Sequence, residues 1–155
     1  PVKDIAMTVD AFHRMGLASA GVELVLVGHG GEGFVRPGVQ TSGPLASDDL
    51  QRLLSRADIL VVSSRAENAP LVIAEAASAG VLPIVRAVGG MPEMVSMLGH
   101  GHTFASGAEL ETLLMTESKT SSSARQKRRL AIRSRAKTVW GIESVVALYD
   151  KVYGS

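Results

Sequence analysis

Residues 57–80 read ADILVVSSRAENAPLVIAEAASAG and form the most strongly patterned part of the chain. The segment Ile59–Val62 is short and uniformly apolar, which is typical of a strand in a parallel sheet covered on both faces. Residues 68–79 are mostly apolar and predict a helix, with Asn68 as a candidate cap and Pro70 in the first turn. The stretch therefore predicts a buried strand, a polar loop and a largely buried helix.

The same alternation of strand and helix extends in both directions along the chain. We expect further strands at 22–27, 39–42, 82–85 and 102–105, and helices at 4–17 with Asp4 as cap, from 47, from 92, at 109–115 and, as two helices, over 124–153. Right-handed crossovers between such strands predict an α/β, Rossmann-like, three-layer domain with a parallel sheet. Ligands of these sheets bind at the carboxyl ends of the strands, so the loops after Val27, Val62 and Val85 are the informative ones.

Composition limits the classes of function. The 155 residues fit one domain, 46% of them are hydrophobic, and a net charge of +1 gives no overall field toward nucleic acid. The absence of cysteine excludes disulfides, thiolate metal sites and cysteine nucleophiles. The chain starts at Pro1 without a methionine or a signal-peptide pattern, so we expect a fragment of a longer protein.

Two glycine-rich loops follow predicted strands. Residues 28–33 read GHGGEG and residues 89–93 read GGMPE, the second directly before a predicted helix. Glycines permit positive φ and close approach of the backbone to a ligand, which is one interpretation of both loops. The alternative is a plain turn, because glycine motifs alone have weak specificity.

Two glutamates stand out near the decisive segment. Glu67 lies in the loop after the strongest strand, and Glu75 is the only charged residue between Ala69 and Gly80. A carboxylate on a buried helix needs hydrogen-bond donors, and ligand hydroxyls would supply them. The alternative is that Glu75 lies on a narrow exposed stripe of the helix.

The order and spacing of these features resemble the C-terminal, donor-binding domain of family 4 retaining glycosyltransferases (glycosyl transferases group 1, GT-B fold). The resemblance is carried by Glu67 and Glu75 with seven residues between them, by LVLVGHG at 24–30, by AGVLPIV at 79–85, by GGMPE at 89–93 and by Lys3 eight residues before Ala11-Phe12. It covers residues 1–155 as one nucleotide-sugar-binding domain. Family members carry a central strand and an arginine just before the position of Lys3, and their acceptor-binding N-terminal domain precedes both.

The resemblance implies a role for individual residues. Glu67 would bind the donor sugar closest to the chemistry, Glu75 would accept hydrogen bonds from the ribose, and Lys3 would neutralise the diphosphate. The other donor-binding positions that it implies are the backbone at Asn68, Ala69, Pro70 and Leu71 and the glycines Gly28, Gly30, Gly89 and Gly90.

The implied activity is transfer, with retention, from a UDP- or GDP-sugar to a hydroxyl of a sugar or lipid-linked acceptor. We expect no metal and no cofactor, and no transfer by this chain without an acceptor domain. The alternatives are a non-catalytic donor-binding module or subunit, and another GT-B enzyme such as a nucleotide-sugar epimerase.

Residues 125–137 are strongly basic, with positive side chains at 125, 127, 128, 129, 133, 135 and 137. A solvated helix face is the favoured interpretation, and a peripheral contact with anionic lipids is the alternative. We expect a cytoplasmic protein. We expect no nucleic-acid partner, because basic and aromatic residues do not alternate as single-stranded nucleic acid requires.

Overall fold

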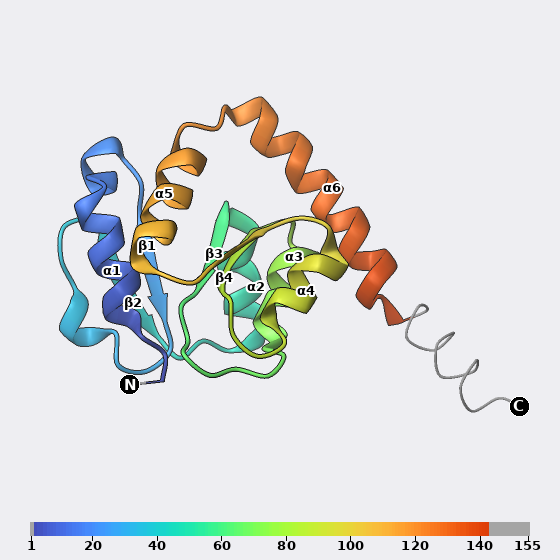
Figure 1. Ribbon diagram of the computed structural model, residues 1–155, viewed down its shortest axis with the longest axis horizontal. Helices are drawn as coiled ribbons and strands as arrows, with labels where there is room; N and C mark the ends of the chain where they lie inside the picture. Colours follow the sequence, from blue (N-terminus) through green and yellow to red (C-terminus); the bar gives the residue numbers. More distant parts are fainter. Residues whose placement is uncertain (1, 143–155) are drawn as a thin grey trace, which may run out of the picture.

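Parallel strands form the centre of the molecule, and helices surround them (Figure 1). The computed structural model describes residues 2–142. The strands are β1 (Leu24–Val27), β2 (Val39–Gly43), β3 (Ile59–Val62), β4 (Leu82–Arg86) and β5 (His102–Phe104). They form two sheets, in the orders β1-β2 and β3-β4-β5, and every pair is parallel. The predicted α/β fold with parallel strands is therefore confirmed.

Helices connect the strands at nearly all the expected places. They are α1 (Ile5–Arg14), α2 (Ser47–Arg56), α3 (Leu71–Ser78), α4 (Met91–Leu98), α5 (Gly107–Ser118) and α6 (Ser122–Trp140), with the short 3-10 helices η1 (Leu17–Ala20) and η2 (Glu32–Phe34). Helix α6 covers 122–140 of the span 124–153 in which the pattern predicted two helices. The remainder of that span, from 143 on, lies outside the described residues, so the second helix stays a prediction.

Both faces of the larger sheet are covered. Ile59 and Val61 of β3 pack in a cluster with apolar side chains of α1 and α5. Leu60 and Val62 pack instead against buried residues of α3 and α4. Successive side chains of a strand point to opposite faces, so this alternation defines a helical layer on each side of the sheet.

Although it is as apolar as β4, strand β3 is less buried. Its four residues are half-buried, whereas Leu82–Val85 are fully buried, because β4 pairs on both sides and β3 pairs only with β4 among the described strands. Just beyond the carboxyl end of β3, the Arg65 amide donates to the Val2 carbonyl at 2.7 Å. The central strand that the family resemblance implies before Lys3 stays a prediction.

Of the two predicted helix caps, Asn68 is wrong, and Asp4 has the predicted position without a capping side-chain bond. Helix α3 begins at Leu71 rather than at Asn68, because the residue before Pro70 is disfavoured from helical geometry and the Asn68 carbonyl instead accepts from the Gly90 amide at 2.8 Å. Asp4 occupies the N-cap position of α1, but its side chain forms no cap hydrogen bond. Its carboxylate turns to Arg65 and Arg86.

Helix α6 is attached to the domain through its buried Ile132 and Ala136 and also through some of its basic residues. Arg129 donates to the Ala57 carbonyl at 2.8 Å, beyond the end of α2, and Arg135 donates to the Met97 carbonyl at 3.2 Å, in the last turn of α4. Carbonyls at helix ends attract cations, so these contacts are favourable. The favoured interpretation of a merely solvated face is therefore wrong for Arg129, which is half-buried, whereas Arg135 is exposed.

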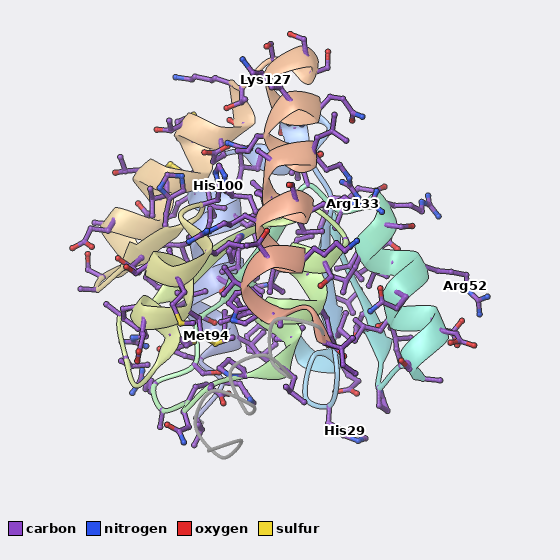
Figure 2. All side chains as sticks on the ribbon, turned by 90° about the vertical axis from the view of Figure 1, so that its right-hand side faces the viewer. His29, Arg52, Met94, His100, Lys127 and Arg133 are labelled. Atoms are coloured by element: carbon purple, nitrogen blue, oxygen red, sulfur yellow. The ribbon has the colours of Figure 1, made fainter. Side chains whose placement is uncertain are left out.

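The rest of α6 lies along the surface, with Lys127 near its start and Arg133 near its middle (Figure 2). A lipid contact through these side chains stays a prediction. Within residues 2–142, no helix has both the length and the apolar composition that crossing a membrane requires.

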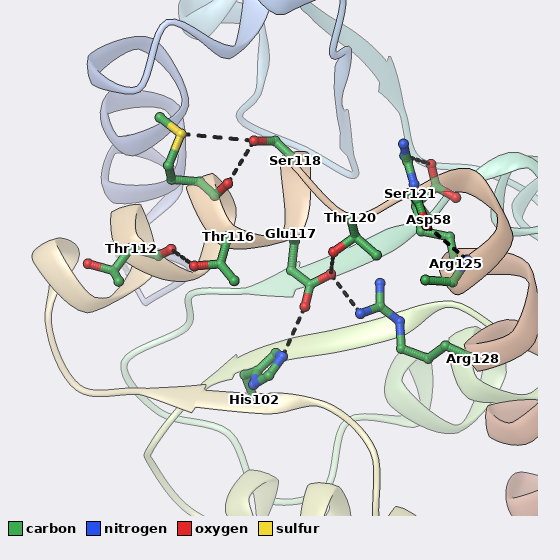
Figure 3. Close-up of polar contacts among 12 residues, drawn as sticks. Asp58, His102, Thr112, Thr116, Glu117, Ser118, Thr120, Ser121, Arg125 and Arg128 are labelled. Atoms are coloured by element: carbon green, nitrogen blue, oxygen red, sulfur yellow. Dashed lines mark hydrogen bonds and ion pairs between the residues drawn. The ribbon is translucent and has the colours of Figure 1, made fainter.

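The buried carboxylate of Glu117 joins β5, α5 and α6 (Figure 3). Its side chain is 6% exposed. It accepts from Arg128 at 2.7 Å, pairs with His102 Nε2 at 3.2 Å and accepts from the Thr120 hydroxyl at 3.4 Å. A buried charge with several partners is costly to leave incomplete, so this network fixes how α6 meets the sheet.

We expect Glu117→Ala to lower the free energy of unfolding by about 2–3 kcal/mol, because it leaves the Arg128 and His102 side chains without their acceptor. Urea unfolding followed by circular dichroism measures this loss. The control is Asp49→Ala, which breaks a pair with Arg52 on the surface of α2 and should cost less than about 0.5 kcal/mol. Equal losses in the two variants would contradict a stabilising role for the Glu117 network.

Candidate functional site

Three loops and the N-terminal turn lie at the carboxyl ends of the strands. Residues 28–31 follow β1, residues 63–70 follow β3, residues 87–90 follow β4, and residues 2–4 lead into α1. Gly28, Glu67 and Gly89 therefore all lie beyond carboxyl ends of parallel strands, where α/β proteins bind ligands.

The Lys3 ammonium and the Glu67 carboxylate meet at this edge, 64 residues apart in the chain. The Lys3 side chain is 67% exposed and the Glu67 side chain is 18% exposed. The hydrogen bond from Lys3 lowers the pKa of the Glu67 carboxyl from its ordinary value, while partial burial opposes the shift and a hydrogen bond from Ser64 adds to it. Glu67 is therefore ionised at neutral pH, and an exposed cation stands beside it.

Gly89 and Gly90 hold the backbone of the Glu67 loop. A Cβ atom at Gly89, whose φ is 55°, would lie 1.7 Å from the Glu67 carbonyl oxygen, and one at Gly90 would lie 2.4 Å from the Asn68 carbonyl oxygen. The Gly90 amide also donates to the latter oxygen. The two glycines thus face the loop that carries Glu67, and only residues without a side chain allow this approach.

The start of α3 is open to solvent. Leu71 is 78% exposed although it is the first residue of an otherwise apolar helix. The first turn of any helix has amide N–H groups without helical acceptors, and it carries the positive end of the helix dipole. Asn68, Ala69 and Pro70 lead directly into this turn from Glu67, so the predicted diphosphate-binding segment borders the Lys3–Glu67 pair.

Glu75 lies one turn further along α3, on the same stripe as Leu71 and Ser78. It is half-buried, and none of the ion pairs or side-chain hydrogen bonds among residues 2–142 involves its carboxylate. The structure therefore agrees with the stripe interpretation of its position. The same position leaves the carboxylate accessible to a ligand that lies over the start of α3.

Gly28 and Gly30 adopt left-handed backbone geometry, with φ of 106° and 86°. A Cβ atom at either would meet nothing within 4 Å. Within the described chain, no hydrogen bond joins this loop to residues 67–70. The loop therefore leaves open space at the end of β1, which both the ligand and the plain-turn interpretations allow.

Sequence reasoning missed a polar cluster that surrounds Asp4. Its carboxylate accepts from Arg65 Nε at 2.9 Å and from Arg86 Nη1 at 2.7 Å. Hydrogen bonds and charge from Arg65, and secondarily Arg86, lower the pKa of the Asp4 carboxyl against the opposing effect of burial. An arginine that ends an apolar strand, as Arg86 does, was the available signal, because such a charge needs a partner.

Comparisons with known proteins agree with this geometry. The sequence model of the family described as glycosyl transferases group 1 matches residues 1–117. Comparison with curated protein sequences gives no significant match.

Solved structures of glycosyltransferases share the fold. One is WaaG, a glycosyltransferase involved in lipopolysaccharide biosynthesis, with 23% identity and a TM-score of 0.76 over 99% of this chain and 44% of that one. Another is HepE from Anabaena in complex with UDP, with 20% identity and a TM-score of 0.78 over 99% and 46%. A third is sucrose-phosphate synthase from Thermosynechococcus elongatus, with 20% identity and a TM-score of 0.75 over 99% and 42%.

The chain thus spans less than half the length of each of these structures. Its parallel strands, its helical layers and its family match lead to the same assignment. The chain belongs to the glycosyl transferases group 1 family and has the α/β fold of the C-terminal half of GT-B glycosyltransferases.

Proposed function

We propose that this chain is the donor-binding domain of a retaining, family 4 glycosyltransferase. It would hold a nucleoside diphosphate sugar whose glycosyl group passes to an acceptor hydroxyl. The observation that carries the proposal is the meeting of Lys3 and Glu67 beside the open start of α3. This arrangement offers a cation and free amides for a diphosphate and a carboxylate for sugar hydroxyls.

The electrostatics of the edge suit the leaving group. Negative charge develops on the diphosphate as the bond to the sugar breaks, and groups that stabilise this charge accelerate the transfer. Lys3 and the first turn of α3 are the positive groups on this edge that the proposal uses. Because Lys3 contacts Glu67 in the free protein, an arriving diphosphate would compete for the ammonium and free the carboxylate for the sugar.

We further propose UDP as the nucleotide and binding without a divalent metal. Structures of HepE contain UDP and UDP-glucose, and this chain shares their fold, which supports uridine over guanosine as the first base to test. Lys3 and the helix terminus would offset the diphosphate charge without a cation bridge. Glu75 would accept hydrogen bonds from the ribose hydroxyls, for which its unpaired, accessible carboxylate is suited.

Transfer itself would require an acceptor-binding domain, because group transfer needs both reactants held in reactive geometry. A non-catalytic donor-binding module, or another GT-B enzyme such as an epimerase, would use the same donor edge. Transfer of labelled sugar to an acceptor, measured with the acceptor domain joined to this chain, distinguishes these alternatives from the proposed transferase.

The wild-type chain should bind UDP with a dissociation constant of up to about 1 mM, and Glu75→Ala should weaken binding about tenfold or more, because a hydrogen bond to a charged acceptor is lost. Isothermal calorimetry with UDP and GDP, in Mg²⁺ and in excess EDTA, measures both effects. The control is Glu23→Ala, which removes an exposed carboxylate before the opposite end of β1 and should leave the affinity unchanged. A folded wild-type chain that binds neither nucleotide would overturn the proposal, and a requirement for Mg²⁺ would contradict its metal-free form.

Gly89→Ala should reduce UDP affinity at least tenfold, since its Cβ would push the Glu67 carbonyl away and displace the loop. Gly99→Ala is the matched control. Gly99 has a similar φ, 66°, but a Cβ there meets nothing within 4 Å, so it adds backbone strain without a clash. We expect Gly99→Ala to keep UDP affinity within about twofold of wild type. Calorimetry on both folded variants provides the comparison, and equal affinities would show that the Gly89 contact does not shape the site.

A further inference from the structure

The backbone of Asp4, next to Lys3, has an unusual conformation. Asp4 is the only non-glycine residue within 2–142 with positive φ, at φ 46° and ψ 43°. This left-handed region is disfavoured for residues with a Cβ atom and persists where the surroundings hold it. Asp4 directly follows Lys3, so whatever holds Asp4 also determines where the Lys3 side chain begins.

Strong polar contacts hold the Asp4 side chain. Its carboxylate, 9% exposed, accepts from Arg65 just beyond β3 and from Arg86 at the end of β4. Both bonds end on the same oxygen, at 2.9 and 2.7 Å. Hydrogen bonds between ionised partners are stronger than neutral ones, so two strand ends anchor this one side chain.

The backbone on either side of Lys3 is anchored to the same strand end. The Ser63 hydroxyl lies 3.0 Å from the Lys3 carbonyl oxygen and 3.1 Å from that of Asp4, and it donates to this pair. The Arg65 amide donates to the Val2 carbonyl at 2.7 Å. The turn of residues 2–4 is thus fixed against the loop that carries Glu67.

The Lys3 side chain itself has little to hold it. It is mostly exposed, and its one ion pair among the described residues is with Glu67. A long, flexible ammonium side chain reaches a ligand reproducibly only if its backbone is fixed, because its own rotamers are free. The anchor at Asp4 supplies that fixed starting point.

We propose that Asp4 is a positioning residue of the donor site, which acts through Arg65 and Arg86 to set Lys3 for the phosphates of a nucleoside diphosphate. Asp4 does not touch the nucleotide in this account. The inference rests on the proposed function, and it goes further by assigning a role to an ion cluster that would otherwise only stabilise the fold.

The test is a double-mutant cycle on UDP affinity with Asp4→Asn and Lys3→Ala. Asparagine keeps the size of the side chain and tolerates left-handed geometry, so the fold should survive. In the wild-type background, Asp4→Asn should weaken UDP binding about tenfold. In the Lys3→Ala background it should change the affinity less than about twofold, because the group that Asp4 positions is gone.

A second variant covers a failure of Asp4→Asn to fold. Arg65→Gln alters an exposed partner of the same carboxylate. It should weaken UDP binding about threefold in the wild-type background and hardly at all with Lys3→Ala. Thermal unfolding by circular dichroism accompanies each measurement. A purely structural role would lower the melting temperature and weaken UDP binding equally in both backgrounds, which overturns the inference.

The other outcomes separate this inference from the proposed function. If wild type binds UDP, Lys3→Ala weakens binding and Asp4→Asn does not, the positioning role alone is wrong. If Lys3→Ala binds UDP as tightly as wild type, or if wild type does not bind it, the proposed donor site fails and the positioning role fails with it.

Discussion

The contact between the Gly89–Gly90 turn and the carbonyls of Glu67 and Asn68 is the constraint on which the site depends. The loops after β3 and β4 approach so closely that neither glycine has room for a Cβ atom. Because the two strands are parallel neighbours, this contact ties the Glu67 loop to the most buried strand of the larger sheet. Helix α3 begins directly after this loop, so the contact also fixes the position of the free amides in its first turn.

The ionic contacts of the domain differ in how far they are buried. The buried carboxylates of Asp4 and Glu117 form ionic contacts that hold elements of the fold together. In the Lys3–Glu67 pair, by contrast, the lysine side chain is largely exposed. An exposed pair contributes little to stability, and its charges are correspondingly available to a ligand. In the proposed function, a diphosphate replaces Glu67 as the partner of Lys3. This replacement costs little stability because the pair is exposed.

The strand and helix pattern was predictable because the apolar runs, such as Ile59–Val62, are short and the turns between them carry glycine or proline. Helix starts were less predictable, because the tertiary bond from Gly90 to Asn68 decides where α3 begins. The family resemblance drew attention to Lys3 and Glu67, which the fold brings into contact. For the Asp4 cluster, the sequence indicated only that Arg86 needs a partner. It did not indicate Asp4 as that partner, because the two residues lie 82 positions apart and share no local pattern.

A crystal structure of the protein with UDP tests the central claim most directly, since that claim is the position of the diphosphate. The account predicts phosphate oxygens within hydrogen-bond distance of Lys3 Nζ and of backbone amides at the start of α3, with the ribose hydroxyls at the Glu75 carboxylate. Lys3 would then no longer pair with Glu67. UDP bound elsewhere on the domain, with the Lys3–Glu67 pair intact, would contradict the account.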